Sequence, residues 1–157
     1  AYNLDGSHQK WVEAVAQQMT DTLGVPTEGR PFETFKQMRQ EVTARHITGA
    51  FRTSWQAEYP DESSFLAPLF ASYSAANESG FRNATFDDLL EQAGKAATDA
   101  EADEYYKQAQ DLLVDAMPAI PLWTSKSLGA YGKDIIPACY TWKPLPNYYL
   151  IQRSSAR

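Results

Sequence analysis

The sequence predicts an α/β fold, a mixed sheet that contains a βαβ unit and is flanked by helices. Three observations support this prediction. Within the first 26 residues, an extended segment, an amphipathic helix and a second extended segment follow one another, which is the order of a βαβ unit. At residues 46–55, every second residue falls on one face, which is typical of a strand, and three further helical patterns follow between residues 63 and 117.

The predicted βαβ unit begins with a short strand at Tyr2–Leu4 and a turn at Asp5–Ser7. Ser7 can cap the following helix, because its hydroxyl can accept a free backbone N–H. Gly24 is placed to end the helix in a left-handed conformation, and Val25–Pro26 continues as extended chain. Apolar residues spaced four apart give this helix one buried face: Trp11, Val15, Met19 and Leu23.

A second helix and a longer strand are predicted next. The helix follows Pro31 and carries Phe32, Phe35, Met38 and Val42 on one side. In the strand, His46–Trp55, alternate residues share one face: Ile47, Gly49, Phe51, Thr53 and Trp55.

The end of this predicted strand is the candidate binding site. Pro60 interrupts the strand, because proline has no backbone N–H and a fixed φ. Trp55, Glu58 and Tyr59 therefore lie together where a strand leaves its sheet, which is where α/β proteins tend to bind ligands. The alternative is structural: Trp55 and Tyr59 belong to the core, and Glu58 is a solvated loop carboxylate.

Three helices are predicted in the second part of the chain. The first runs from about Ser63 to Ala71, with Phe65, Leu66 and Leu69 on its apolar face, and Ser72–Gly80 forms a loop. A capping-box pattern at Thr85–Asp88 starts the second, whose buried stripe is Phe86, Leu89, Leu90 and Ala93. The third starts at Thr98 and ends at Met117, before Pro118, with five residues facing inward: Ala102, Tyr105, Ala109, Leu112 and Ala116.

The remainder of the chain is predicted to be extended. Ala119–Trp123 contains two prolines and is predicted to be an edge strand or a connector. Strand-like residues recur at Tyr140–Trp142 and Tyr148–Ile151. An apolar extended tail needs a partner strand, either in this chain or in a part of the protein that is absent from it.

Composition excludes several classes of protein. The net charge of −6, with dispersed basic residues, argues against nucleic acid as a partner. Cys139 is the one cysteine, so the chain has no internal disulfide. No apolar run approaches the roughly 18 residues of a membrane span, and the first residues do not resemble a signal peptide. The chain does not begin with Met, so we expect a piece of a longer protein.

Catalytic and metal-binding patterns are missing from the sequence. His8 and His46 have no second ligand at metal spacing, so we predict neither a metal nor another cofactor. No nucleophile–base pair is evident. Glu58 and Asp61 could in principle form a glycosidase pair, but on one loop they do not straddle a scissile bond. We therefore predict that the protein is not an enzyme.

Three segments resemble, in order, those of the extracellular solute-binding proteins of family 5, the peptide-, dipeptide- and nickel-type receptors of ABC importers. Residues 54–61, Ser-Trp-Gln-Ala-Glu-Tyr-Pro-Asp, are similar to the family's Gly-Trp-x-Ala-Asp-Tyr-x-Asp-Pro segment. Residues 81–90 are similar to its Tyr-x-Asn-Pro-x-Phe-Asp-x-Leu-Leu helix start. Residues 115–123 are similar to its Asp-x-Pro-x-Ile-Pro-Leu-Tyr stretch. The resemblance covers nearly the whole chain.

The resemblance implies that this chain is the C-terminal part of a receptor with the two-lobed periplasmic-binding-protein fold. Residues 1–134 would belong to the second lobe, and residues 135–157 would be a tail that returns to the first. The complete receptor would be extracytoplasmic, either periplasmic or anchored at the cell surface. It would enclose short peptides between its lobes and deliver them to the membrane permease subunits of an ABC importer.

The same resemblance suggests roles for the candidate site residues. Glu58 stands in place of the family's aspartate that receives a peptide's α-ammonium group, Trp55 is the neighbouring aromatic wall, and Tyr59 follows in the same segment. The chain departs from the family pattern at three positions: Glu58 replaces Asp, while Glu62 and Ala84 replace prolines. Relatives of this family carry oligosaccharides, nickel chelates or other small solutes, so these ligands remain alternatives. With an oligosaccharide, Trp55 and Tyr59 would stack on sugar faces, and Glu58 would accept hydrogen bonds from hydroxyls. A glycosidase-like enzyme using Glu58 and a plain interaction module are more remote ones.

Overall fold

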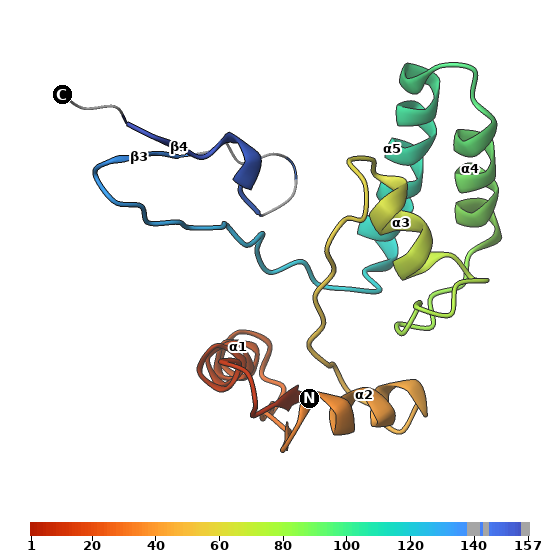
Figure 1. Ribbon diagram of the computed structural model, residues 1–157. Coiled ribbons are helices and arrows are strands. Elements are labelled where there is room, and N and C mark those ends of the chain that lie inside the picture. The colour runs from red at the N-terminus through yellow and green to blue at the C-terminus, as the bar shows by residue number, and fades with distance from the viewer. Residues whose placement is uncertain (138–141, 143–144, 155–157) are drawn as a thin grey trace. The chain divides into compact units, whose positions relative to one another are not determined.

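The computed structural model describes residues 1–137, 142 and 145–154, which fall into two compact units (Figure 1). The first unit is Ala1–Trp55 and the second is Gln56–Arg157. The first contains β1 (Tyr2–Asn3), α1 (Gln9–Leu23), β2 (Pro31–Phe32) and α2 (Phe35–Thr43). The second contains α3 (Ser63–Phe70), α4 (Ala84–Lys95), α5 (Asp99–Ala116), β3 (Ile135–Ile136), the 3-10 helix η1 (Tyr148–Leu150) and β4 (Gln152–Arg153).

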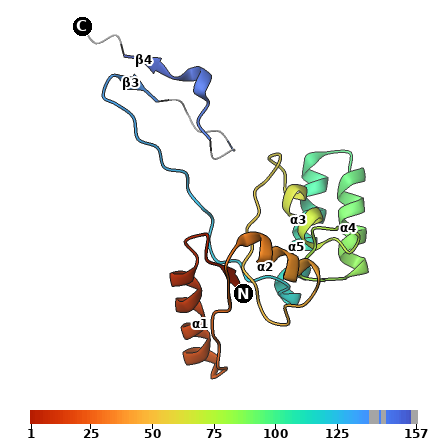
Figure 2. The same ribbon diagram turned by 60° about the horizontal axis from the view of Figure 1, so that its bottom comes forward.

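The predicted βαβ unit is confirmed in the first unit, with its second strand later in the chain than expected. β1 pairs in parallel with β2, Tyr2 opposite Pro31 and Asn3 opposite Phe32. The strand predicted at Val25–Pro26 is instead connecting chain. The 15 residues of α1 span about 22 Å, far more than two-residue β1, so the chain runs back along the helix before it reaches β1. Figure 2 shows this connection beside α1, where Thr27 N–H donates to the Thr20 hydroxyl at 2.9 Å.

The end of α1 agrees with the prediction, and its start does not. Gly24 adopts φ 67° and donates its N–H to the Thr20 carbonyl at 3.0 Å, as a left-handed C-cap does. His8 occupies the N-cap position in place of Ser7, and no side chain caps the helix there. On the predicted apolar face, Leu23 is exposed, while Ala16 is the buried residue of the helix.

α2 begins three residues later than Phe32, which lies in β2. Thr34 and Gln37 form a capping box: the Thr34 hydroxyl accepts the Gln37 N–H, and the Gln37 side chain accepts the Thr34 N–H. Met38 and Val42 are buried, as predicted. The cap, rather than Pro31, therefore sets where this helix starts.

The predicted strand His46–Trp55 is wrong. Residues 46–55 have no regular structure. Two backbone hydrogen bonds join them to Ala1, the residue before β1. The Ala1 amino group donates to the Ala50 carbonyl at 2.6 Å, and Arg52 N–H donates to the Ala1 carbonyl at 3.0 Å. A ladder of ten residues needs a partner of similar length, and β1 offers two residues. The segment therefore has the sequence alternation of a strand, but β1 is too short to pair with it.

The predicted helices of the second unit are confirmed, but the capping box predicted at Thr85–Asp88 is wrong, because Asn83 is the N-cap of α4. α4 and α5 lie side by side as a helical hairpin, and α3 packs against both (Figure 1). The Asn83 side chain caps α4 by accepting the Phe86 N–H, and the Thr98 side chain caps α5 by accepting the Glu101 N–H. The core contains Leu66, Ala71, Phe86, Leu89, Leu90, Ala93, Tyr106 and Ala109. Phe86 is fully buried and contacts Phe81 edge to face, with ring centroids 5.5 Å apart.

The buried face of α5 differs in part from the prediction. Ala109 is buried as expected, and Ala102, Tyr105 and Leu112 are partly buried and pack against the core. Tyr106 is buried as well, although it was not predicted, and Ala116 is exposed. α5 has 18 residues and α4 has 12, so the last turns of α5 extend beyond the hairpin partner. Residues near Ala116 thus lie beyond the part of α5 that pairs with α4.

The loop predicted at Ser72–Gly80 is ordered around one buried amide. The Asn77 side chain donates to the carbonyls of Phe70, Ala71 and Phe81 at 2.8 to 3.2 Å. Its oxygen accepts the Ser79 hydroxyl and the Gly80 N–H. These bonds satisfy the amide completely, which stabilises an irregular loop against the helices.

The C-terminal region contains a small antiparallel pair outside the segments that were predicted as strands. Of the two alternatives for Ala119–Trp123, the connector is the one observed. Residues 119–131 have no regular structure and are exposed. β3 pairs with β4, Ile135 opposite Arg153. The strand predicted at Tyr148–Ile151 is wrong, since its first three residues form η1. In this register the partner of residue 151 would be Pro137, which has no N–H to donate. Of the strand predicted at Tyr140–Trp142, Tyr140 and Thr141 lie outside the described residues, as does Cys139.

Candidate functional site

The three predicted site residues fall into two units. Trp55 is the last residue of the first unit, and its side chain is 38% exposed. Glu58 and Tyr59 belong to the second unit and are exposed. The structure thus brings Glu58 and Tyr59 together in one turn, residues 58–64, which we call the site turn.

Side chains at the far end of the site turn bind its beginning. Glu58 N–H donates to the Ser64 hydroxyl oxygen at 2.8 Å. The Tyr59 and Ser63 hydroxyls lie 3.0 Å apart and share a hydrogen bond. Asp61 accepts the Ser63 N–H on its carboxylate at 2.8 Å, which is an Asx turn of the kind that starts a helix. The turn is therefore a closed, hydrogen-bonded structure.

The site turn is attached to the helical core through α3 and α5. The Gln110 side chain of α5 donates to the Glu62 carboxylate at 2.8 Å. Leu66, in the first turns of α3, is buried in the core. Burial raises the pKa of Tyr106, and the nearby Ser63 hydroxyl partly opposes this shift. The turn is therefore held on packed helices, although it is itself at the surface.

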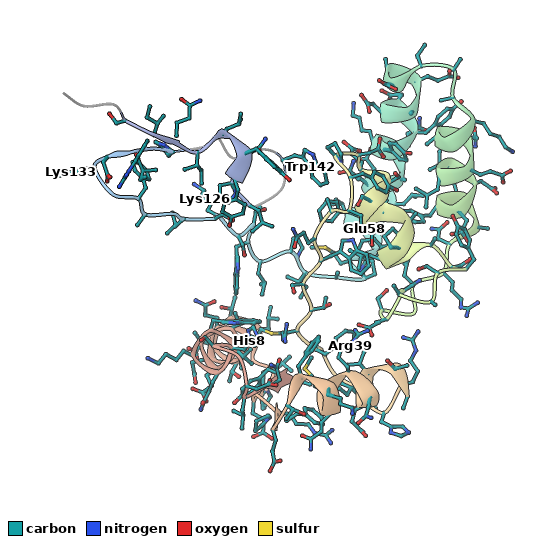
Figure 3. All side chains as sticks on the ribbon, in the orientation of Figure 1. His8, Arg39, Glu58, Lys126, Lys133 and Trp142 are labelled. Atoms are coloured by element: carbon teal, nitrogen blue, oxygen red, sulfur yellow. The ribbon has the colours of Figure 1, made fainter. Side chains whose placement is uncertain are left out.

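Figure 3 labels Glu58 on the segment that leads into α3. The residue is exposed, and its backbone N–H is bound within the turn. An exposed carboxylate on a fixed backbone can accept charge-assisted hydrogen bonds from an ammonium group or bonds from hydroxyls. These are the two ligand chemistries that the sequence left open for Glu58.

A second cluster of polar side chains, in the first unit, was missed by sequence reasoning. We call Asn3, Asp5 and Arg52 the N-terminal polar network. The Arg52 guanidinium donates to the buried Asn3 side-chain oxygen, at 2.9 Å from Nε, and the Asn3 amide donates to Asp5. Asp5 also accepts the Phe35 N–H at 2.9 and 3.0 Å. The network connects residues 3 and 52, which are 49 positions apart, so no local sequence pattern predicts it.

The network changes the pKa of its charged members. The hydrogen bond from Asn3 and that from the Phe35 backbone lower the pKa of the Asp5 carboxyl. Burial lowers the pKa of the Arg52 guanidinium, and Asp5 opposes that shift. The Arg52 guanidinium also lies over the Phe35 ring, 4.8 Å from its centroid. Arg52 is thus held in place by hydrogen bonds and by ring stacking.

His8, labelled in Figure 3, lies at the start of α1, close enough to Arg52 and Asp5 to interact with their charges. Its Nδ1 accepts the Trp11 indole N–H at 3.3 Å, so the bound form of the ring is neutral. A Cβ added at Gly6 would come within 2.6 Å of His8 Nε2, which shows that the ring is enclosed on that side. Burial, and then the Arg52 charge, lower the pKa of His8, while Asp5 raises it less.

We expect the stability of the first unit to fall in mild acid through His8. Folding lowers the pKa of His8, so the folded state favours the neutral ring. The contribution of His8 to the free energy of unfolding is therefore complete above the unfolded-state pKa of about 6.5. It is lost as the pH falls from 6.5 through the folded-state pKa. NMR titration of the His8 ring should give a midpoint below 6.5, and the Trp11 indole resonance should shift with it. A His8→Gln variant should lose this part of the pH dependence. A midpoint at or above 6.5 would contradict the prediction.

The described residues also bear on metal binding and on membrane insertion. Among them, no three His, Cys, Asp or Glu side chains are arranged so that they could hold a metal ion. No helix in the described part of the chain has both the length and the apolar character needed to cross a membrane.

Comparison with known proteins gives relatives that cover most of this chain. The periplasmic murein peptide-binding protein MppA of Escherichia coli (strain K12) is 31% identical over 127 residues, which are 78% of this chain and 22% of MppA. The glutathione-binding protein GsiB of Escherichia coli (strain K12) is 36% identical over 89 residues, which are 54% of this chain and 17% of GsiB. No family model matches the chain.

Solved structures give MppA again and one further relative. The unliganded open form of the murein tripeptide-binding protein MppA matches with a TM-score of 0.70 at 30% identity, over 74% of this chain and 22% of MppA. The pheromone receptor PrgZ, whose mode of peptide binding is known, matches with a TM-score of 0.63 at 28% identity, over 74% of this chain and 22% of PrgZ. The chain therefore spans about a fifth of the length of the relatives it matches.

Proposed function

Because the chain is homologous to the C-terminal portion of solute-binding proteins of family 5, we propose that it is the peptide-binding segment of an ABC importer's receptor. The complete receptor captures short peptides between two lobes and delivers them to the permease subunits in the membrane. It works outside the cytoplasm, as the name of MppA states for that relative. It is a binding protein rather than an enzyme, since the relatives are named for what they bind.

The observation that carries this proposal is the match to three proteins named for peptide-type ligands. MppA is a murein peptide-binding protein, GsiB is a glutathione-binding protein, and PrgZ is a pheromone receptor that binds peptide. These ligands differ in side chains and share main-chain groups. A receptor for them needs a sequence-blind anchor, and the exposed Glu58 carboxylate on the site turn supports that role.

We further propose roles for the other candidate residues. Trp55 is exposed, so its ring can form an aromatic wall that tolerates varied side chains. The Tyr59 hydroxyl is bound to Ser63, and the residue is 47% exposed, so its ring is the remaining contact surface. Both residues would then contact the ligand through ring faces rather than through hydrogen bonds.

The lobe division is also a proposal: residues 1–134 belong to the second lobe, and residues 135–157 return to the first. Many large apolar side chains from residue 117 onward are exposed, more than a folded surface ordinarily leaves in contact with water. Among the described residues of this region, those at least half exposed are Met117, Ile120, Trp123, Leu128, Tyr131, Leu145, Tyr148, Tyr149 and Leu150. The remainder of the receptor chain is the proposed cover for this surface.

Titration of the complete receptor with peptides tests the function. We expect saturable changes in tryptophan fluorescence with free peptides of two to five residues, and much weaker binding of the same peptides after N-acetylation. The 157-residue chain alone should give no saturable response, because most of the receptor is absent. A response only to oligosaccharides or to a nickel chelate would contradict the peptide ligand and favour the alternatives.

A further inference from the structure

The geometry points to Ser64 as the positioning residue for the Glu58 carboxylate, an inference that rests on the proposed function. Ser64 is buried at 3% exposure and lies in the first turn of α3. Its hydroxyl oxygen accepts the Glu58 N–H at 2.8 Å, across six residues of chain. A buried side chain thus fixes the backbone from which the proposed ligand-binding carboxylate extends.

Ser64 can act in this way because its own backbone is held on both sides. Its N–H donates to the Asp61 carbonyl at 3.1 Å, which closes the turn before the helix. Two residues later, Leu66 lies in the core with α4 and α5. The hydroxyl therefore connects Glu58 to the most firmly packed part of the unit, and a displacement of residue 58 would break that bond.

Fixing the backbone matters more for glutamate than for the shorter aspartate. The glutamate side chain has one more rotatable bond, so its carboxylate covers more positions for a given backbone and loses more entropy on binding. Without the Ser64 bond, motion of the backbone would be added to that freedom. The entropy lost on ordering this side chain lowers the affinity only of ligands that bind the carboxylate, which are those with a free ammonium group.

The test compares two serine variants of the complete receptor with free and N-acetylated forms of one peptide. Ser64→Ala should weaken binding of the free peptide about 2- to 12-fold, the range expected for one ordinary hydrogen bond, and leave the acetylated peptide unchanged. Ser74→Ala is the matched control, because it removes a serine hydroxyl that donates to the Pro68 carbonyl at 2.7 Å, away from the site turn. It should leave the ratio of the two affinities unchanged.

The ratio separates positioning from a general loss of structure. A receptor that folds poorly loses affinity for both peptides alike, so the ratio of the two affinities does not change. Ser64→Thr, which retains the hydroxyl, should restore the ratio that Ser64→Ala lowers. The inference is overturned if Ser64→Ala leaves the ratio as it is while Glu58→Gln lowers it. If Glu58→Gln also leaves the ratio unchanged, the ammonium role of Glu58 is wrong, and the role of Ser64 is lost with it.

Discussion

Replacing Glu58 with Gln in the complete receptor is expected to weaken binding of free peptides about 10- to 150-fold. This range corresponds to the loss of one charge-assisted hydrogen bond, about 1.5–3 kcal/mol. Gln keeps the size of the side chain and can still accept a bond, but it carries no negative charge for the peptide ammonium group. Affinities from calorimetry or from fluorescence titration give the measurement.

Three comparisons make this result specific. N-acetylated peptides should bind both proteins equally, because they have no ammonium group to lose. Glu91→Gln is the matched control, since Glu91 is an exposed glutamate of α4 that pairs with Lys95. Glu58→Asp, which restores the family's residue, should retain discrimination between free and acetylated peptides. Equal losses for free and acetylated peptides in Glu58→Gln would show that Glu58 does not bind the ammonium group.

Replacing Phe86 with Ala is expected to lower the free energy of unfolding of the α3–α5 region by about 3–5 kcal/mol, the range for truncation of a buried aromatic residue. Phe86 has no exposed surface, and its ring contacts that of Phe81 edge to face. Because α3, α4 and α5 share one core, the cavity weakens all three helices. Chemical denaturation followed by far-UV circular dichroism measures the change.

Phe65→Ala provides the control, with the same substitution on α3 at a residue that is 41% exposed. We expect it to cost about 1 kcal/mol or less, since much of that ring is already in water. Losses of equal size in the two variants would mean that Phe86 does not occupy the centre of this core.

The helices could be predicted because their determinants are close together in the sequence. Thr98 and Glu101 are three residues apart, and the hydroxyl of the first accepts the N–H of the second as expected. The stripe from Phe86 to Ala93 repeats at helical spacing and is buried throughout. The family resemblance, which depends on motifs of eight to ten residues, is likewise confirmed by the relatives.

The strand pairing and the bonds of the site depend on contacts that the sequence does not display. Residues 46–55 have the alternation of a strand, but alternation does not reveal that β1 is two residues long. Glu58, Trp55 and Tyr59 could be proposed from a motif, whereas the bond between Glu58 and Ser64 depends on how the turn closes. The roles of these three residues stay predictions. The link between Asn3 and Arg52 spans 49 residues, beyond any periodic pattern.

The two units should also differ in how fast they form. In α4 and α5, the contacting residues are joined by a connection of three residues, so their contact order is low and the hairpin can assemble early. The first unit brings residue 2 next to residue 31 and residue 1 next to residue 52, which requires two long loops to close first. We therefore expect α4–α5 to be the nucleus on which α3 and the site turn are ordered, with the parallel pair forming later.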